Sequence, residues 1–225
     1  MTSSADSPDS KFDISRVLGV LGGQDMSPEL LQIWLKSASI VLAADSGADV
    51  VMSANKLADF VVGDLDSISQ EAIDAHSRVI RDPDQDTTDC DKLLSLAGEL
   101  GVDSITLANV EGDRFDHMIG TVASAIKSHL NVRLALRQGV GWVLRPNQAI
   151  EVPTEPGSGV ALLPMMPSRG VVLDGVAWKL SNAEMSVDGL VSVSNRAERE
   201  TVRARIESGA ALLIVEIPTD QLPIW

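Results

Sequence analysis

The sequence predicts an α/β fold, a doubly wound and mostly parallel sheet, followed by a small all-β sandwich. The first observation is that short apolar segments alternate with segments of helical spacing from Arg16 to about Arg137. This alternation is typical of a parallel sheet with helices on both faces. The second is that prolines and glycine-rich turns become frequent after about Gly139, where no long helical pattern remains. Such a change indicates short antiparallel strands.

In the first part, the apolar segments give the expected strands. These are Val17–Leu21, Ile40–Ala44, Phe60–Val62, Arg78–Ile80, Ile105–Ala108 and Val132–Leu136. The segments between them have helical spacing, and Pro28 suits the first turn of the first helix because that position needs no backbone donor. The expected helices are Pro28–Lys36, Ala48–Asn55, Gln70–Ser77, Thr88–Leu100 and Phe115–His129.

In the second part, turn residues separate short segments of strand-like composition. The expected strands are Gly159–Pro164, Gly170–Leu173, Leu190–Ser194, Thr201–Ile206 and Ala211–Ile217. We place the change between residues 138 and 147. The expected division is therefore a disordered tail over 1–14, an α/β domain over 15–140 and a β-sandwich domain over 145–225.

The composition excludes several classes of protein. Its 18 Lys and Arg against 32 Asp and Glu give a net charge of −14, which argues against binding nucleic acid. No apolar run approaches the roughly 20 residues that a membrane span needs. The single cysteine, Cys90, cannot form an internal disulfide and favours a reducing compartment. We therefore expect a soluble cytoplasmic protein.

Acidic residues follow three of the expected strands. Asp45 follows one strand, Asp64 and Asp66 follow the next, and five aspartates lie between residues 82 and 91. Ligands of open parallel sheets bind at the carboxyl ends of the strands, so these carboxylates are expected to meet at one cleft. Clustered carboxylates repel one another and favour a hard cation such as Mg²⁺ or Ca²⁺. The alternative is that they are solvated loop residues, which is common for aspartate in turns.

Two polar segments border this cleft. Thr87 or Thr88 can cap the helix that follows, and Asp89 and Lys92, three residues apart, share a face of that helix. A carboxylate for a metal and an ammonium for a phosphate would then meet at a helix N-terminus, although a capped surface helix with a local ion pair explains the spacing equally well. The second segment runs from Glu111 to His117, and its Arg114 can bind phosphoryl oxygens. The alternative is that Asp116 only starts a helix and that His117 is a structural histidine.

Taken together, four motifs resemble thiamine pyrophosphokinases. They are A-A-D-S-G-A-D (43–49), G-D-L-D-S-I (63–68), D-Q-D-T-T-D-C-D-K (84–92) and G-D-R-F-D-H (112–117). Two later motifs, G-V-A-W-K-L (175–180) and S-V-S-N (192–195), look like the thiamine-binding domain of that family. The resemblance covers roughly residues 16–217, and it lies in the ordered set rather than in any one motif.

The resemblance implies a homodimer that transfers the diphosphate group of ATP to the hydroxyl of thiamine and releases AMP. It implies that Mg²⁺ is held by Asp64, Asp66 and Asp89, with Lys92 and Arg114 completing the catalytic set. By the same resemblance, the nucleotide is bound by Asp45, Gln85, Asp86, Thr88, Lys92, Arg114, Asp116 and His117. The vitamin is bound by Trp178, Ser192, Ser194 and Asn195, near the dimer interface.

The sequence departs from the family pattern at Ser46, Asp49, Asn109 and Asp113. These changes leave the expected metal carboxylates and Lys92 in place, so they bear on nucleotide affinity more than on the reaction. Two other functions remain open at this point: a diphosphokinase that acts on another alcohol, such as a hydroxymethylpterin, and a catalytically silent sensor of nucleotide or thiamine. The chain has no G-x-x-x-x-G-K-[ST] loop, so carboxylate-held Mg²⁺ must replace such a phosphate cradle.

Overall fold

The computed structural model describes residues 13–23, 26–112 and 114–225. The expected disordered tail, residues 1–14, lies almost entirely outside these ranges, as does Asp113. Within the described residues, none of the helices is both long enough and apolar enough to cross a membrane.

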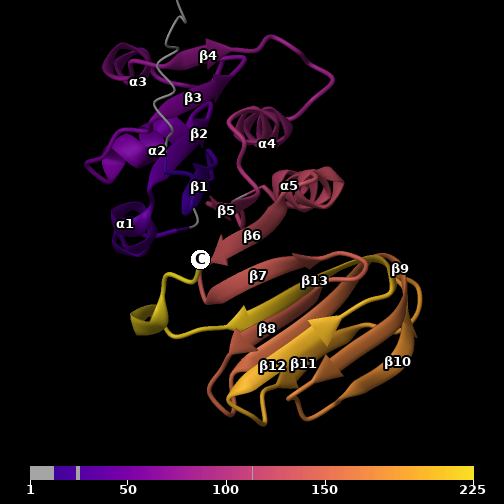
Figure 1. Cartoon of the computed structure of the whole chain (residues 1–225). Helices are drawn as coiled ribbons and strands as arrows, with labels where there is room; N and C mark the ends of the chain where they lie inside the picture. Colours follow the sequence, from indigo (N-terminus) through magenta and orange to yellow (C-terminus); the bar gives the residue numbers. More distant parts are fainter. Residues whose placement is uncertain (1–12, 24–25, 113) are drawn as a thin grey trace, which may run out of the picture.

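The first part of the chain is a sheet of parallel strands with helices on two sides. Its strands lie in the order β4-β3-β2-β1-β5-β6, and each neighbouring pair is parallel. Figure 1 shows α1, α2 and α3 on one side of these strands and α4 and α5 on the other. The strands are β1 (Val17–Val20), β2 (Ile40–Ala44), β3 (Phe60–Gly63), β4 (Val79–Arg81), β5 (Ser104–Ala108) and β6 (Asn131–Leu136). The helices are α1 (Pro28–Ser37), α2 (Gly47–Ser53), α3 (Gln70–Ala75), α4 (Asp89–Glu99) and α5 (Phe115–Lys127).

Side-chain caps fix where three of these helices begin. Ser27, Ser69 and Thr88 each accept a hydrogen bond from a backbone N–H of the first turn of α1, α3 and α4. These caps satisfy donors that have no partner inside the helix, and Pro28 removes one such donor altogether. The expected strands and helices of this part are therefore confirmed, and their ends differ by two residues or fewer.

The second part is built from antiparallel strands. They are β7 (Gly139–Leu144), β8 (Ala149–Pro153), β9 (Gly159–Asp174), β10 (Leu180–Met185), β11 (Ser192–Arg196), β12 (Thr201–Arg205) and β13 (Ser208–Glu216), followed by the short 3-10 helix η1 (Thr219–Gln221). The first half of β9 pairs with β11 and β13, and its second half pairs with β10 and β12. One long strand thus joins the two sets of neighbours.

The prediction of separate strands at Gly159–Pro164 and Gly170–Leu173 is wrong, because both belong to β9. Prolines interrupt the hydrogen bonds of a ladder, so Pro164 and Pro167 indicated a break. The strand instead continues with irregular pairing: opposite residues 208–211 of β13, its register shifts twice, and each time β9 contains one residue more than β13. Strands β7, β8 and β10 were not predicted.

Strand β7 connects the two parts. It pairs antiparallel with β6 on one edge and with β13 on the other, so a single mixed sheet runs from β4 to β8. The expected boundary at residues 138–147 contains this strand, and the division into separate domains stays a prediction.

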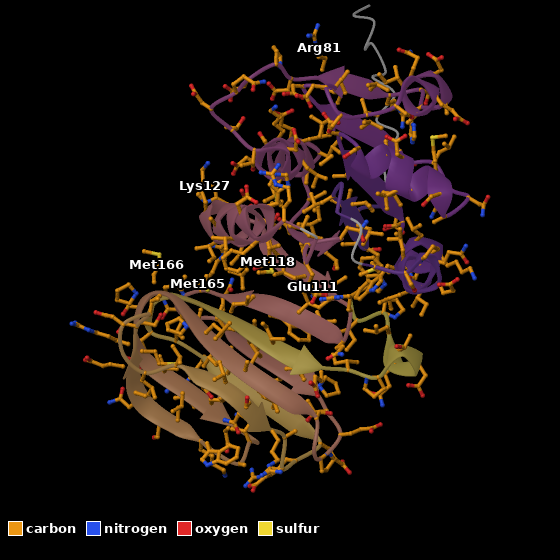
Figure 2. All side chains as sticks on the ribbon, turned by 180° about the vertical axis from the view of Figure 1, so that it is seen from behind. Arg81, Glu111, Met118, Lys127, Met165 and Met166 are labelled. Carbon is orange, nitrogen blue, oxygen red and sulfur yellow. The ribbon has the colours of Figure 1, made fainter. Side chains whose placement is uncertain are left out.

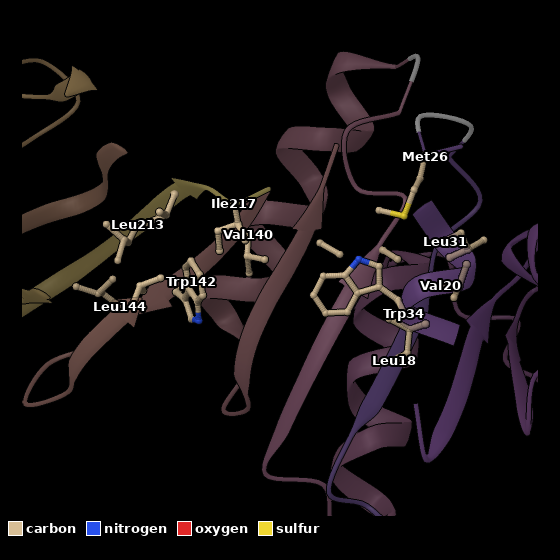
Figure 3. Packing of buried hydrophobic residues seen from close by; sticks show 14 of the residues in the cluster. Leu18, Val20, Met26, Leu31, Trp34, Val140, Trp142, Leu144, Leu213 and Ile217 are labelled. Carbon is tan, nitrogen blue, oxygen red and sulfur yellow. The ribbon is translucent and has the colours of Figure 1, made fainter. Parts of the chain in front are cut away.

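The buried apolar residues of the described ranges form two clusters, and each contains residues of both parts. The first cluster is the larger. It contains Leu18 and Trp34 of the first part together with Trp142, Leu144 and Leu213 of the second. Figure 3 shows these side chains along the faces of the strands and α1. The other cluster packs α4 and α5 against the opposite face, through residues such as Leu93 and Ala125.

Candidate functional site

The site begins with Asp45, immediately after β2. Its carboxylate is buried and accepts hydrogen bonds from the backbone N–H of Leu65 at 3.0 Å and from Oγ of Ser67 at 2.8 Å. Both donors belong to the loop that follows β3, so Asp45 holds that loop against the end of β2. Gly63 is required here because a Cβ at this position would lie 2.9 Å from Oδ2 of Asp45 and 3.2 Å from its Cα.

Asp45, Asp64 and Asp66 form an acidic triad, in which one oxygen of each lies within 4.8 Å of the others. A hydrogen bond from the side chain of Gln85, at 2.8 Å, lowers the pKa of Asp64. The charge on Asp64 is the largest cause that raises the pKa of Asp66, and Asp45 adds to it. The three carboxylates therefore repel one another in the absence of a cation.

Helix α4 brings a cation and a further carboxylate to the triad. Thr88 and Asp91 form a capping box at its start, which fixes the first turn. The side chain of Lys92 is only 2% exposed, and its Nζ lies 3.7 Å from Oδ1 of Asp89. Burial and then the charge on Asp45 raise the pKa of Asp89, against the charge of Lys92. A buried lysine side chain and a carboxylate with a raised pKa thus lie at the N-terminus of α4.

A cavity of about 530 Å³ opens beside these groups. Eight of the predicted site residues line it: Asp64, Gln85, Thr88, Asp89, Lys92, Arg114, Asp116 and His117. Its lining does not include three other predicted residues, namely the triad members Asp45 and Asp66 and also Asp86. The expected metal ligands were Asp64, Asp66 and Asp89, whereas the triad consists of Asp64, Asp66 and Asp45. The metal assignment of Asp89 remains a prediction.

The start of α5 forms the opposite wall of the cavity. Arg114 and Asp116 make an exposed ion pair with Nη2 and Oδ2 2.6 Å apart, and its hydrogen bond lowers the pKa of Asp116. Met118 also lines the cavity. Figure 2 shows Glu111 and Met118 where this part of the molecule faces the second part.

Several residues that line the cavity were missed as site residues. Among them, Ser46 and Ser67 carry hydroxyls, and Asn109 is a buried amide with a φ of 59°. The left-handed backbone conformation is tolerated by asparagine, which could have indicated that this position ends a strand in a turn. Asp49, another departure from the family pattern, accepts a hydrogen bond from the backbone N–H of Ser69 at 3.0 Å and so joins α2 to α3.

The predicted vitamin-binding residues gather elsewhere, in the second part. The buried amide of Asn195 accepts a hydrogen bond from the backbone N–H of Trp178 at 3.1 Å and donates one to its carbonyl at 2.8 Å. Ser192 accepts from the same amide at 3.3 Å, whereas Ser194 is exposed with a φ of 56°. Trp178 is 58% exposed, and the guanidinium of Arg196 lies 5.4 Å from the centre of its ring.

None of these four residues lines the cavity beside the triad. In Figure 1, β11 lies in the lower, second part of the molecule, away from β2 and β3. Within one chain, the two groups of predicted residues are therefore separate.

The arrangement beside the triad suits a phosphorylated ligand with a bound divalent cation. Carboxylate oxygens are the ligands that Mg²⁺ and Ca²⁺ prefer, and a helix N-terminus with a buried lysine favours phosphate. The exposed Arg114 adds planar hydrogen-bond donors that match phosphoryl oxygens.

Comparison with known families agrees with this chemistry. Residues 31–136 match the model of the thiamin pyrophosphokinase catalytic domain, and residues 147–213 match that of the thiamin pyrophosphokinase vitamin B1 binding domain. Thiamine pyrophosphokinase 1 of Oryza sativa is 32% identical over 67% of this chain and 63% of its own length. Thiamine pyrophosphokinase 2 of Arabidopsis thaliana is 28% identical over 88% of this chain and 85% of its own.

Solved structures show the same fold. The thiamin pyrophosphokinase of Candida albicans superposes with a TM-score of 0.75 at 20% identity and covers 90% of this chain and 88% of its own. The thiamine pyrophosphokinase of Bacillus subtilis gives a TM-score of 0.75 at 19% identity over 89% of this chain and 98% of its own. The two family models together span most of the sequence, in the order that the motifs predicted. The chain therefore belongs to the thiamin pyrophosphokinase family, and synthesis of thiamine diphosphate is the function that this membership supports.

Proposed function

We propose that this protein transfers the diphosphate group of ATP to the hydroxyl of thiamine, giving thiamine diphosphate and AMP. The observation that carries the proposal is the meeting of the acidic triad with the buried Lys92 at the edge of one cavity. The side chain of Lys92 is 2% exposed, and among the described residues only Asp89, at 3.7 Å, lies within ion-pair distance of it, so its ammonium can bind an anionic group that enters the cavity. The catalytic and vitamin-binding family matches, in that order along the chain, support thiamine and ATP as the two proposed substrates.

Mg²⁺ is the proposed metal. The fit rests on the triad itself, because three carboxylates whose oxygens lie within 4.8 Å of one another repel unless a cation is shared between them. The charge on Asp64 accordingly raises the pKa of Asp66. Asp64 and Asp66 are the proposed ligands, with Asp45 or Asp89 as the third. When bound, the ion supplies charge neutralisation to the phosphate oxygens.

The roles of the protein side chains follow from their positions. Lys92 binds phosphate oxygens at the start of α4, and Arg114 binds them from the opposite wall. Gln85 donates a hydrogen bond to Asp64 and orients that carboxylate. Because charge grows on the phosphoryl oxygens during the transfer, positioning and electrostatic stabilisation provide most of the catalysis. Asp86, Thr88, Asp116 and His117 are proposed to complete the nucleotide site.

The vitamin site is proposed to lie between two copies of the chain. Trp178, Ser192, Ser194 and Asn195 are its proposed residues, with Trp178 as a surface for the cationic ring of thiamine. Apolar side chains are exposed nearby: Val187, in the turn after β10, is 76% exposed, and Val193 of β11 is 58% exposed. Exposed apolar surface of this kind favours association with a second copy, which would bring this site to the cavity of its partner. The single cysteine supports a reducing, cytoplasmic compartment as the proposed location.

The test is release of AMP from ATP and Mg²⁺ with and without thiamine, with the product identified by mass. Thiamine-dependent AMP together with thiamine diphosphate is the expected result. AMP release with a hydroxymethylpterin but not with thiamine would replace the acceptor and keep the reaction. Binding of ATP or thiamine without AMP release from any acceptor would identify a silent sensor and overturn the proposal.

A further inference from the structure

A second cavity, of about 510 Å³, lies at the other end of the parallel strands. It is lined by Ser104 and Asn131, the first residues of β5 and β6, whereas the first cavity is lined by Asn109, just beyond the end of β5. The second cavity therefore lies at the amino ends of these strands. It shares no lining residue with the first, so it is a separate site.

Apolar side chains form part of the walls of this cavity. The apolar lining residues include Trp142 of β7, Ile150 of β8, and Ile224 and Trp225 from the segment after η1. The indole of Trp225 is fixed by α1: it donates a hydrogen bond to Oγ of Ser37 at 3.2 Å and packs edge-on against Trp34, with ring centres 5.6 Å apart. The indole of Trp225 is thus already held in place.

Arg133 of β6 contributes a cation to the same cavity. It is half-buried, and its Nη1 donates a hydrogen bond to Oγ of Ser104 at 2.7 Å, which orients the guanidinium. No carboxylate of the described residues lies within ion-pair distance of it, and burial lowers its pKa. A guanidinium has five N–H donors, so most of them remain for a ligand.

The one carboxylate among the lining residues does not compete for Arg133. Glu151 makes an ion pair with Arg203, at 2.6 Å, on the neighbouring strand. The amide of Gln148 donates to Asn131 at 3.2 Å, so these two polar side chains are also paired. Arg133 is left as the charged group of the cavity that lacks a counter-ion among the described residues.

We propose that this cavity binds a small organic anion with a flat apolar group, the anion on Arg133 and the flat group against Trp142 and Trp225. A planar guanidinium matches a carboxylate or phosphate in two-point contact, and indoles offer large flat apolar surfaces. Because the cavity is lined by β5 and β6 of the first part and by β8 of the second, such a ligand would contact both parts at once. This inference does not depend on the proposed reaction.

Phenyl phosphate is a suitable probe, and the indole N–H signals of the four tryptophans in an NMR spectrum are the readout. Trp→Phe variants assign the four signals. We expect phenyl phosphate to shift the signals of Trp142 and Trp225 in a saturable manner and to leave that of Trp178 unchanged. Binding of the probe to the first cavity is distinguishable, because none of its described lining residues is a tryptophan. Benzoate should act on the same two signals.

Arg133→Gln should weaken binding of phenyl phosphate about tenfold or more, since it removes a charge-assisted contact. Arg199→Gln, which removes an equal charge from an exposed ion pair with Asp174, should leave the affinity unchanged. Should Arg133→Gln fail to fold, benzyl alcohol on the unaltered protein serves instead: the same ring without the charge should bind far more weakly. The inference would be overturned by any of three results: benzyl alcohol binds as tightly as phenyl phosphate, Arg133→Gln binds phenyl phosphate with unchanged affinity, or the signals of Trp142 and Trp225 do not shift.

Discussion

At the scale of single residues, the burial of Lys92 makes it the most sensitive position in the candidate site. Lys92→Met keeps the length and apolar character of the side chain but removes the ammonium that lies 3.7 Å from Asp89. We expect turnover to fall by about 100-fold or more, as is usual when a stabilising donor is lost from a site where charge develops. Initial rates of AMP release at saturating ATP and thiamine measure this.

The matched control is Lys127→Met. Lys127 is 70% exposed and pairs with Asp91 at 3.3 Å, so it carries the same charge on the neighbouring helix but lies outside the cavity. Its loss should change the rate little. If the two variants lose activity equally, the rate depends on general charge and not on the position of Lys92.

Cys90 provides a second prediction at this scale. Its side chain lines the cavity but is buried, and burial raises the pKa of its thiol to about 12. The thiolate is the reactive form, so Cys90 should react slowly with iodoacetamide at neutral pH in the folded protein and rapidly in urea. Mass spectrometry of the alkylated protein follows both rates. Similar rates in the two states would show that the thiol is accessible.

How far single residues could be predicted depends on how local their determinants are. Asp64 and Asp66 follow an apolar strand in the sequence, so their place at its carboxyl end required only that the strand be recognised. The membership of Asp45 in the triad arises from hydrogen bonds across two loops, to Leu65 and Ser67, about 20 residues away. Contacts of this kind depend on the register of β2 against β3, which no local pattern contains.

At the scale of elements, α4 illustrates how a cap supports the site. The side chain of Thr88 accepts a hydrogen bond from the backbone N–H of Asp91, and the side chain of Asp91 accepts one from the backbone N–H of Thr88. The two residues of this capping box thus satisfy each other's backbone donors at the start of the helix. Thr88→Ala should lower the free energy of unfolding by about 1 kcal/mol, the usual cost of losing an N-cap. Urea unfolding measures the change.

The control for this variant is Ser27→Ala, which removes the equivalent cap of α1 and is not among the residues that line the cavity. Both variants should be destabilised to a similar extent, but only Thr88→Ala should also raise the KM for ATP, because Thr88 lines the cavity. An unchanged KM in Thr88→Ala would limit this residue to a structural role.

Elements differ in how well the sequence indicates them. The helices and parallel strands of the first part carry local signals, namely caps, Pro28 and continuous apolar segments, and these sufficed. Strand β9 did not follow its local signal, because irregularities within β9 itself, opposite residues 208–211 of β13, accommodate its prolines. Strand β8 exposes most of its residues, so it lacks the clear alternation that identifies a half-buried strand.

At the scale of the whole molecule, Arg145 ties the two parts together. It follows β7, and its guanidinium donates hydrogen bonds to the carbonyls of Ala125, Ile126, Ser128 and Leu130, at and after the end of α5. These are carbonyls that a helix terminus leaves without partners. Arg145→Met should therefore lower the free energy of unfolding by about 2 kcal/mol or more, as several charge-assisted bonds are lost at once.

The same connections predict that the protein unfolds in one step. The sheet is continuous through β6, β7 and β13, and one apolar cluster joins Leu18 and Trp34 to Trp142 and Leu213. Losing either part would expose apolar surface of the other, so a state with only one part folded is costly. Far-ultraviolet circular dichroism and tryptophan fluorescence should then give coincident urea transitions, and Arg145→Met should move both to lower urea by the same amount. Two separate transitions, or a shift of only one signal in Arg145→Met, would mean that β7 connects two parts that unfold independently.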